Sequence, residues 1–170
     1  MWSLKRWRRR KNLRAAFTRH LADEVIDELI KHPRPLQMAP QPASICFILL
    51  QVRDDPVADA SEHLAKALDI IARRNGTVWG VASSIALVSF GAPFSEDAER
   101  DLGQRSKSIA RLVTELGQDI RMVYGTADGL IGNFGAPQRL YYGPLLPGFG
   151  RYLAALTSLE FGQSAEMAAT

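Results

Sequence analysis

Residues 76–93 read GTVWGVASSIALVSFGAP, and this stretch is the most informative part of the sequence for the fold. It holds two apolar runs, at residues 77–82 and 85–90, with only Ser83 and Ser84 between them. Short runs rich in β-branched residues are typical of strands, and a two-residue connection joins neighbouring strands as a hairpin. We therefore predict a tight β-hairpin, followed by a turn at the string FGAP.

Apolar spacing predicts the elements on either side of this hairpin. Before it, SICFILLQV (44–52) is a continuous apolar run, typical of a strand buried on both faces. Apolar residues at three-to-four spacing predict one helix over 57–74 and another over 96–116. The later predicted elements are strands at 119–126, 129–134 and 139–146 and a short helix at 148–159.

The order of these elements predicts an α+β protein. Strand, helix, hairpin, helix and two more strands is the order of a ferredoxin-like sandwich, with helices on one face of a mostly antiparallel sheet. Ahead of the sheet, residues 13–31 have helical apolar spacing, and PRPLQMAPQPA (33–43) is expected to be an extended linker. The expected parts are a basic arm at 1–14, a helical lead-in and linker at 15–43, a domain at 44–160 and a tail at 161–170.

Composition and charge limit the class of protein. The chain has 170 residues, 46% apolar and 23% charged, which suits one buried core and argues against wholesale disorder. Residues 1–14 carry seven basic and no acidic side chains, leaving 14 basic against 18 acidic in the rest. Because the body is acidic, no nucleic-acid partner is expected. The arm, with Trp2 and Trp7 among its charges, is either a segment for an anionic membrane surface or a solvated tail.

The sequence also indicates a compartment. The single cysteine, Cys46, lies within an apolar run, so no internal disulfide is possible and a reduced, cytoplasmic setting is expected. No run of about 18 apolar residues occurs, so no membrane span is expected. We therefore expect a cytoplasmic protein that can rest on the inner membrane surface through residues 1–14.

Three strings resemble the class III nucleotidyl cyclase catalytic domain, the adenylyl/guanylyl cyclase family. Residues 76–93 are similar to family strings such as GTVDKFIGDAVMAVFGAP, and GNFGAPQRLYYG (132–143) is similar to GNIGSPERLDYT. Residues 13–38 resemble the helical lead-in of bacterial membrane-linked cyclases. The resemblance covers about residues 13–160 and implies a ferredoxin-like sandwich of the nucleotidyl cyclase type with an N-terminal helical lead-in. It also implies sites shared between two subunits.

The resemblance implies a metal site whose ligands are degenerate here. In the family, two aspartates on adjacent strands hold two divalent ions that activate the nucleophile and bind the triphosphate. These positions fall at Gln51 and Ser84, which carry no charge, and two divalent ions without carboxylates are unfavourable. Asp54 and Asp55 are weak substitutes that we expect instead to begin a loop and cap the next helix. No metal cofactor is expected, and Mg²⁺ or Mn²⁺ would be needed only if the domain is active.

The remaining family positions are degenerate in the same way. The lysine that reads the base falls at Gly80, and its partner falls at Gly143, or at Pro144 in a second register. The transition-state asparagine and arginine fall at Gly150 and Ala154, or one residue later at Arg151 and Ala155. Loss of the arginine, a cation aimed at the charge that develops on the phosphoryl group, raises the reaction barrier by several kcal/mol. No catalytic residue is therefore expected at these positions.

The sequence therefore favours a cyclase-homology domain without catalysis, acting as a dimerising or regulatory module in cyclic-nucleotide signalling. Its expected partner is a second copy of itself or another cyclase-like domain. Two alternatives are a divergent adenylate cyclase making cAMP from ATP with Asp54 or Asp55, and a module that binds nucleotide without turning it over. Trp79, which replaces a family acidic residue, either fills the mouth of the base pocket or packs against a partner.

Overall fold

The computed structural model describes residues 39–74, 76–90, 107–111, 113, 118–135 and 142–168. The expected basic arm and helical lead-in lie outside the described residues, as does the turn expected at residues 91–93. Of the helix expected over 96–116, residues 107–111 and 113 are described and are helical. Within the described ranges, no helix combines the length and the apolar character that crossing a membrane requires.

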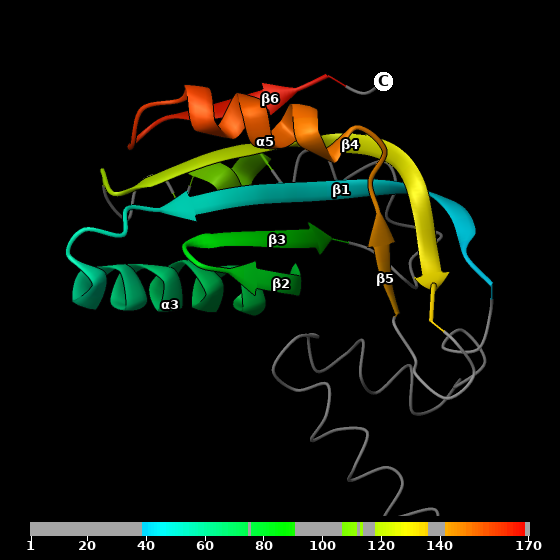
Figure 1. Ribbon diagram of the computed structural model, residues 1–170, viewed down its shortest axis with the longest axis horizontal. Helices are drawn as coiled ribbons and strands as arrows, with labels where there is room; N and C mark the ends of the chain where they lie inside the picture. The colour runs from blue at the N-terminus through cyan, green and yellow to red at the C-terminus, as the bar shows by residue number, and fades with distance from the viewer. Residues whose placement is uncertain are drawn as a thin grey trace, which may run out of the picture.

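A six-stranded sheet forms the centre of the described part of the chain (Figure 1). Its strand order is β2-β3-β1-β4-β5. The sixth strand, β6, also pairs with β4, nearer the start of β4 than β5 does. Every pair of neighbouring described strands is antiparallel except β4 and β6, which run parallel. The strands are β1 (Gln41–Val52), β2 (Gly76–Ala82), β3 (Ile85–Phe90), β4 (Ile120–Asn133), β5 (Tyr142–Leu145) and β6 (Ser164–Met167). The α+β class expected from the sequence is confirmed.

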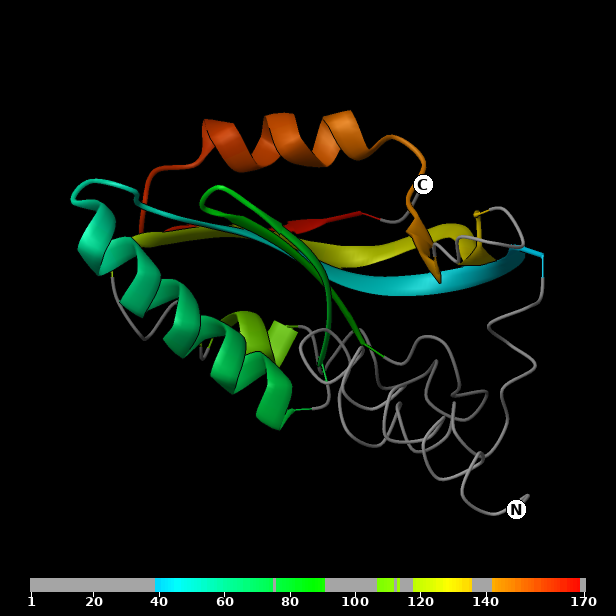
Figure 2. The same ribbon diagram turned by 60° about the horizontal axis from the view of Figure 1, so that its bottom comes forward.

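The apolar run in β1 is buried on both faces, as its composition predicts. Ile48 and its alternate neighbours pack against α3 (Val57–Arg73), while Phe47 and its alternate neighbours pack against α5 (Phe149–Ser158). Figure 2 shows these two helices on opposite sides of the sheet. The expectation that helices cover one face is therefore wrong. A strand apolar on both faces needs cover on both, and Tyr152 of α5 supplies it with a side chain that is 1% exposed.

The predicted hairpin is confirmed. Ala82 pairs with Ile85, so Ser83 and Ser84 form a two-residue turn, and Ser83 has the positive φ of 56° that such turns require. The Val52 N–H donates to the Ser84 carbonyl at 2.9 Å, which fixes the turn beside the end of β1.

Three boundaries differ from the sequence prediction. The two strands expected at 119–126 and 129–134 are one strand, β4, because β1 pairs with it along its length. β1 itself begins at Gln41, inside the expected linker. β6 lies in the expected C-terminal tail and was not predicted, because Ser164–Met167 is only four residues long and has no β-branched or aromatic residue.

The backbone at position 132 requires the glycine that begins the string GNFG. Gly132 has φ of +154°, and a Cβ there would lie 2.7 Å from Pro40 Cα. It also pairs with Gly143 of β5. The close approach at Gly132 lets β5 return alongside β4 and brings Gly143 toward the β2–β3 hairpin.

Candidate functional site

The two positions that the resemblance aligns with the family's metal-binding aspartates lie together at one end of the sheet. Gln51 is at the end of β1, and Ser84 is in the β2–β3 turn and is 6% exposed. The Gln51 Nε2 donates a hydrogen bond to Ser84 Oγ at 3.3 Å. The fold therefore brings the two positions together, and the side chains that meet there are a neutral amide and a hydroxyl.

An arginine that the sequence analysis did not single out completes this group. Arg121 pairs with Gln51 across β1 and β4, and its Nε and Nη2 donate to Gln51 Oε1 at 3.1 and 2.8 Å. Its Nη1 donates to the main-chain oxygens of Thr157 and Leu159, at 3.0 and 2.8 Å, at the C-terminal end of α5. We name Gln51, Ser84 and Arg121 the crevice network. The only sequence signal for Arg121 was a lone cation at the start of an apolar strand.

An aromatic ring adjoins the crevice network. The Arg121 Cζ lies 4.7 Å from the centroid of Phe161, and the Arg53 Cζ lies 4.6 Å from the same centroid. Arg53 also forms an ion pair with Asp119, with Nε and Oδ1 2.8 Å apart. Both side chains of that pair are more than a third exposed, so the pair contributes at most about 1 kcal/mol. This end of the sheet is thus rich in guanidinium groups.

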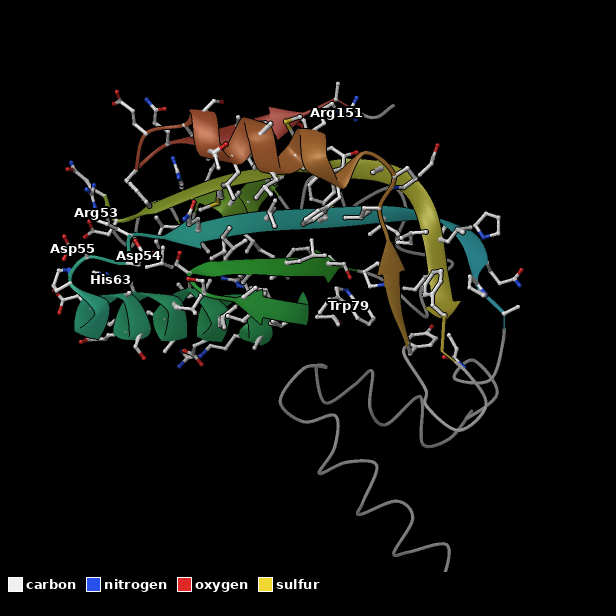
Figure 3. All side chains as sticks on the ribbon, viewed as in Figure 1. Arg53, Asp54, Asp55, His63, Trp79 and Arg151 are labelled. Carbon is white, nitrogen blue, oxygen red and sulfur yellow. The ribbon has the colours of Figure 1, made fainter. Side chains whose placement is uncertain are left out.

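Asp54 and Asp55 lie outside the crevice network. Both are exposed in the loop between β1 and α3, and Figure 3 shows them at the opposite end of the hairpin from Trp79. The expectation that they cap α3 is wrong, because Pro56 is the N-cap residue and no side chain caps the helix. In the part of the chain that the structure describes, no group of three or more His, Cys, Asp or Glu side chains is placed to hold a metal ion.

The two positions that the resemblance aligns with the family's base-reading residues line one pocket. Gly80 of β2 and Gly143 of β5 both face a pocket of about 310 Å³ on the α5 side of the sheet. Trp79, Tyr142 and Phe149 also line it, and none of its described lining residues is Asp, Glu, Lys, Arg or His. A Cβ at position 80 would meet no atom within 4 Å. The pocket is therefore open and apolar where the family would place charged or polar groups.

Trp79 forms part of the pocket wall. The pairing of β2 with β3 shifts between Val78 and Gly80, so Trp79 sits at a β-bulge, a feature that re-aims a side chain. Its ring centroid is 6.2 Å from that of Tyr142, and its Nε1 donates to the buried Ser89 Oγ at 2.6 Å. Burial raises the pKa of Tyr142 to about 12, so its hydroxyl stays protonated at neutral pH. Of the two hypotheses for Trp79, the pocket placement agrees with the structure, while packing on a partner stays a prediction.

The expected transition-state positions lie on α5, outside the residues that line this pocket. Gly150, Arg151 and Ala154 are exposed, Ala155 is half-buried, and none of the four lines the pocket. Arg151 Nη2 donates to the Tyr152 hydroxyl at 3.3 Å, and its Cζ lies 5.1 Å from that ring centroid. The structure therefore joins the expected site residues in two groups, the crevice network and the pocket, and leaves the α5 positions apart.

Solved structures share this arrangement of strands and helices. The guanylyl cyclase Cya2 matches with a TM-score of 0.52 and 22% identity, over 76% of this chain and 77% of that chain. The adenylyl cyclase CyaB from P. aeruginosa matches with a TM-score of 0.59 and 18% identity, over 76% and 79%. This chain has the class III nucleotidyl cyclase fold. A bacterial light-regulated adenylyl cyclase matches with a TM-score of 0.62 and 11% identity, over 81% of this chain and 46% of that longer chain.

The likeness to these cyclases concerns the fold. No protein-family model and no curated protein sequence matches the chain. At identities of 11–22%, the residues of the cyclase-fold domain must be judged from their own chemistry.

Proposed function

We propose that this cyclase-fold domain does not catalyse cyclisation and acts as a dimerising or regulatory module in cyclic-nucleotide signalling. The crevice network carries this proposal. Gln51 Oε1 already accepts two hydrogen bonds from Arg121, which occupy both lone pairs of an amide oxygen. A metal ion that used this oxygen would have to displace the guanidinium.

Electrostatics at the crevice network supports the same conclusion. A divalent ion bound near Gln51 would lie about 4 Å from the Arg121 guanidinium, and at an effective dielectric constant of 20 their repulsion is about 8 kcal/mol. Neither Gln51 nor Ser84 carries a negative charge that would offset this repulsion. The pocket adds to the argument, because Gly80 and Gly143 have no side chain with which to read a base.

A direct assay tests the proposal. The purified chain, incubated with ATP or GTP and Mn²⁺, is expected to form no cyclic nucleotide above a blank without protein. An active cyclase such as CyaB in the same assay shows that formation would be detected. Cyclic AMP above the blank would support the alternative, a divergent adenylate cyclase, and its loss in Asp54→Asn or Asp55→Asn would identify the substitute carboxylate.

A second candidate function is nucleotide binding without turnover, which the pocket favours. Its volume of about 310 Å³ falls in the range of small-molecule sites, and Trp79 and Tyr142 offer aromatic faces to a flat ring. Two other matching cyclase structures, a rhodopsin-guanylyl cyclase and RhGC from Catenaria anguillulae, were solved with ATPαS and GTP. Nucleotide at 100 times its dissociation constant would stabilise the fold by roughly 2.7 kcal/mol. No thermal shift at millimolar ATP or GTP would reject this candidate.

Exposed apolar side chains around the pocket support a dimerising role. Val81 and Phe149 line the pocket and are 47% and 39% exposed, and Leu145 on β5 is 51% exposed. Exposed apolar patches of this kind commonly mark interaction surfaces. We propose a second copy, or another cyclase-like domain, as the partner. Val81→Glu is expected to reduce self-association in sedimentation velocity, whereas Val81→Ile should leave it unchanged.

The basic arm supplies the proposed location. Seven basic residues within 1–14 attract an anionic membrane with about 1 kcal/mol each, and Trp2 and Trp7 suit the headgroup region. We therefore propose a cytoplasmic domain that rests on the inner membrane surface through residues 1–14. Co-sedimentation with phosphatidylserine vesicles, lost in a chain that lacks residues 1–14, is the expected result. Equal binding by both chains would contradict it.

A further inference from the structure

The contacts of Arg121 converge on elements that are far apart in the sequence. Its guanidinium makes two hydrogen bonds to Gln51 on β1 and two to main-chain oxygens at the end of α5. Gln51 extends the connection to Ser84 in the hairpin turn. One side chain on β4 thus links β1, the β2–β3 turn and α5.

The C-terminal end of α5 needs such a partner. The last carbonyls of a helix have no N–H donor within the helix, and the helix dipole favours a cation beside them. The hydroxyls of Thr157 and Ser158 donate to the carbonyls of Ala154 and Ala155, at 2.9 and 2.7 Å. The next turn has no such hydroxyl, and there the oxygens of Thr157 and Leu159 accept from Arg121.

We propose that Arg121 is a positioning residue, a latch that holds the C-terminal end of α5 against β1. Phe149, at the opposite end of α5, lines the pocket. Because α5 is one continuous helix, holding its C-terminal end also holds Phe149 in the pocket wall. The latch holds whether or not the domain turns nucleotide over, so its test and the cyclase assay succeed or fail independently.

The geometry requires arginine and not lysine. The four hydrogen bonds leave two edges of the guanidinium: Nε and Nη2 donate to Gln51 Oε1, and Nη1 donates to the two main-chain oxygens at the end of α5. A lysine ammonium has three donors on a single atom and lacks the planar fork of arginine. It therefore cannot bond to both Gln51 and the end of α5. Arg121→Lys therefore keeps the charge and loses the latch.

Amide hydrogen exchange measures the latch directly. In Arg121→Lys, the amides of residues 155–159 are expected to exchange about tenfold faster than in the wild type, while those of α3 stay unchanged. Arg53→Lys is the matched control, because Arg53 contacts the same Phe161 ring but pairs with Asp119, and within the described residues it bonds to neither α5 nor Gln51. Wild-type exchange at 155–159 in Arg121→Lys would overturn the proposal.

A second experiment tests the pairing of Arg121 with position 51 and keeps the proposal testable if the first variant folds poorly. Gln51→Glu keeps the size of the side chain and places a carboxylate against the guanidinium, a stronger hydrogen bond than the neutral one. The folding equilibrium constant is expected to rise about tenfold at pH 7.

The stability gain of Gln51→Glu should depend on pH in a direction that identifies its cause. The guanidinium lowers the folded-state pKa of the new carboxylate below the unfolded value near 4.3, so the gain is complete above that pH and is lost as the pH falls through the lower, folded-state pKa. Arg53 and Asp119, at the same end of the sheet, are paired with each other. In an Arg121→Met background the gain should disappear. An equal gain in that background would refute the latch.

Discussion

The crevice network and the pocket lie in the same sheet, but their side chains are arranged in opposite ways. In the crevice network, Gln51, Ser84 and Arg121 satisfy one another, and Arg121 also binds the end of α5. In the pocket, Gly80 and Gly143 leave space beside Trp79. The cyclase fold thus retains both parts of the expected site, one filled with an internal polar network and the other open.

This difference predicts how each region responds to substitution. A connected polar network is costly to interrupt, because every removed member leaves another group without its partner. An open apolar pocket accepts added volume at little cost, since no neighbour has to move. The crevice network should therefore be the sensitive region and the pocket the tolerant one.

The largest effect is expected at Arg121. Arg121→Leu removes four hydrogen bonds and leaves Gln51 Oε1 and two α5 carbonyls without that donor. The expected loss is about 3 kcal/mol in the free energy of unfolding, measured with urea. Arg53→Leu, which removes only an exposed ion pair and a ring contact, should cost about 1 kcal/mol or less. Equal losses in both variants would show that Arg121 has no special role.

Trp79 is the exception within the tolerant region. Trp79→Ala removes part of the pocket wall and leaves the Ser89 hydroxyl, which is 0% exposed, without its 2.6 Å hydrogen bond. The expected loss is about 2 kcal/mol in the free energy of unfolding. Trp79→Phe keeps the ring and should lose only about 1 kcal/mol for the hydrogen bond. If both variants are as stable as the wild type, the indole does not support the pocket.

Local patterns explain why most of the fold was predictable. The serine pair between two apolar runs defines the hairpin, and helical spacing places α3 within one residue of its observed end at Arg73. β4 was divided in the prediction at Ala127 and Asp128, residues that disfavour strands, yet pairing with β1 continues through them. β6 has no local signal, and its pairing with β4 is a tertiary effect.

The site was predictable in position and not in its contacts. Gln51 with Ser84, and Gly80 with Gly143, were placed by resemblance to family strings, and the fold brings each pair together. Arg121 was missed because its partner depends on the register of β1 against β4, which no local pattern specifies.

Restoring carboxylates at the two metal positions tests whether the crevice network or the pocket prevents catalysis. Gln51→Asp combined with Ser84→Asp places two negative charges in the crevice network and is expected to cost about 1 kcal/mol without metal. Mn²⁺ at 100 times its dissociation constant should add roughly 2.7 kcal/mol, seen as a thermal shift. Cyclic nucleotide should remain undetected, because the pocket still lacks its base-reading groups.

The matched control for this variant is Gln51→Asn with Ser84→Asn, which has the same size and no charge. It should show no Mn²⁺ shift. A shift of equal size in the control would mean that the carboxylates are not the ligands. Cyclic nucleotide from the double aspartate variant would mean that the metal positions alone had prevented catalysis.

The smallest effect is expected at Gly80. A Cβ there meets no atom within 4 Å, and Gly80→Leu fills the pocket while replacing a strand glycine, which is unfavourable in a strand by roughly 0.5–1 kcal/mol. The free energy of unfolding should stay the same or rise by that amount. Any thermal shift caused by ATP or GTP should disappear, because the added side chain occupies pocket volume that is open beside Gly80. Gly150→Ala, where a Cβ also meets no atom but which lies outside the pocket residues, is the control. A nucleotide shift that survives in Gly80→Leu would place binding elsewhere than in this pocket.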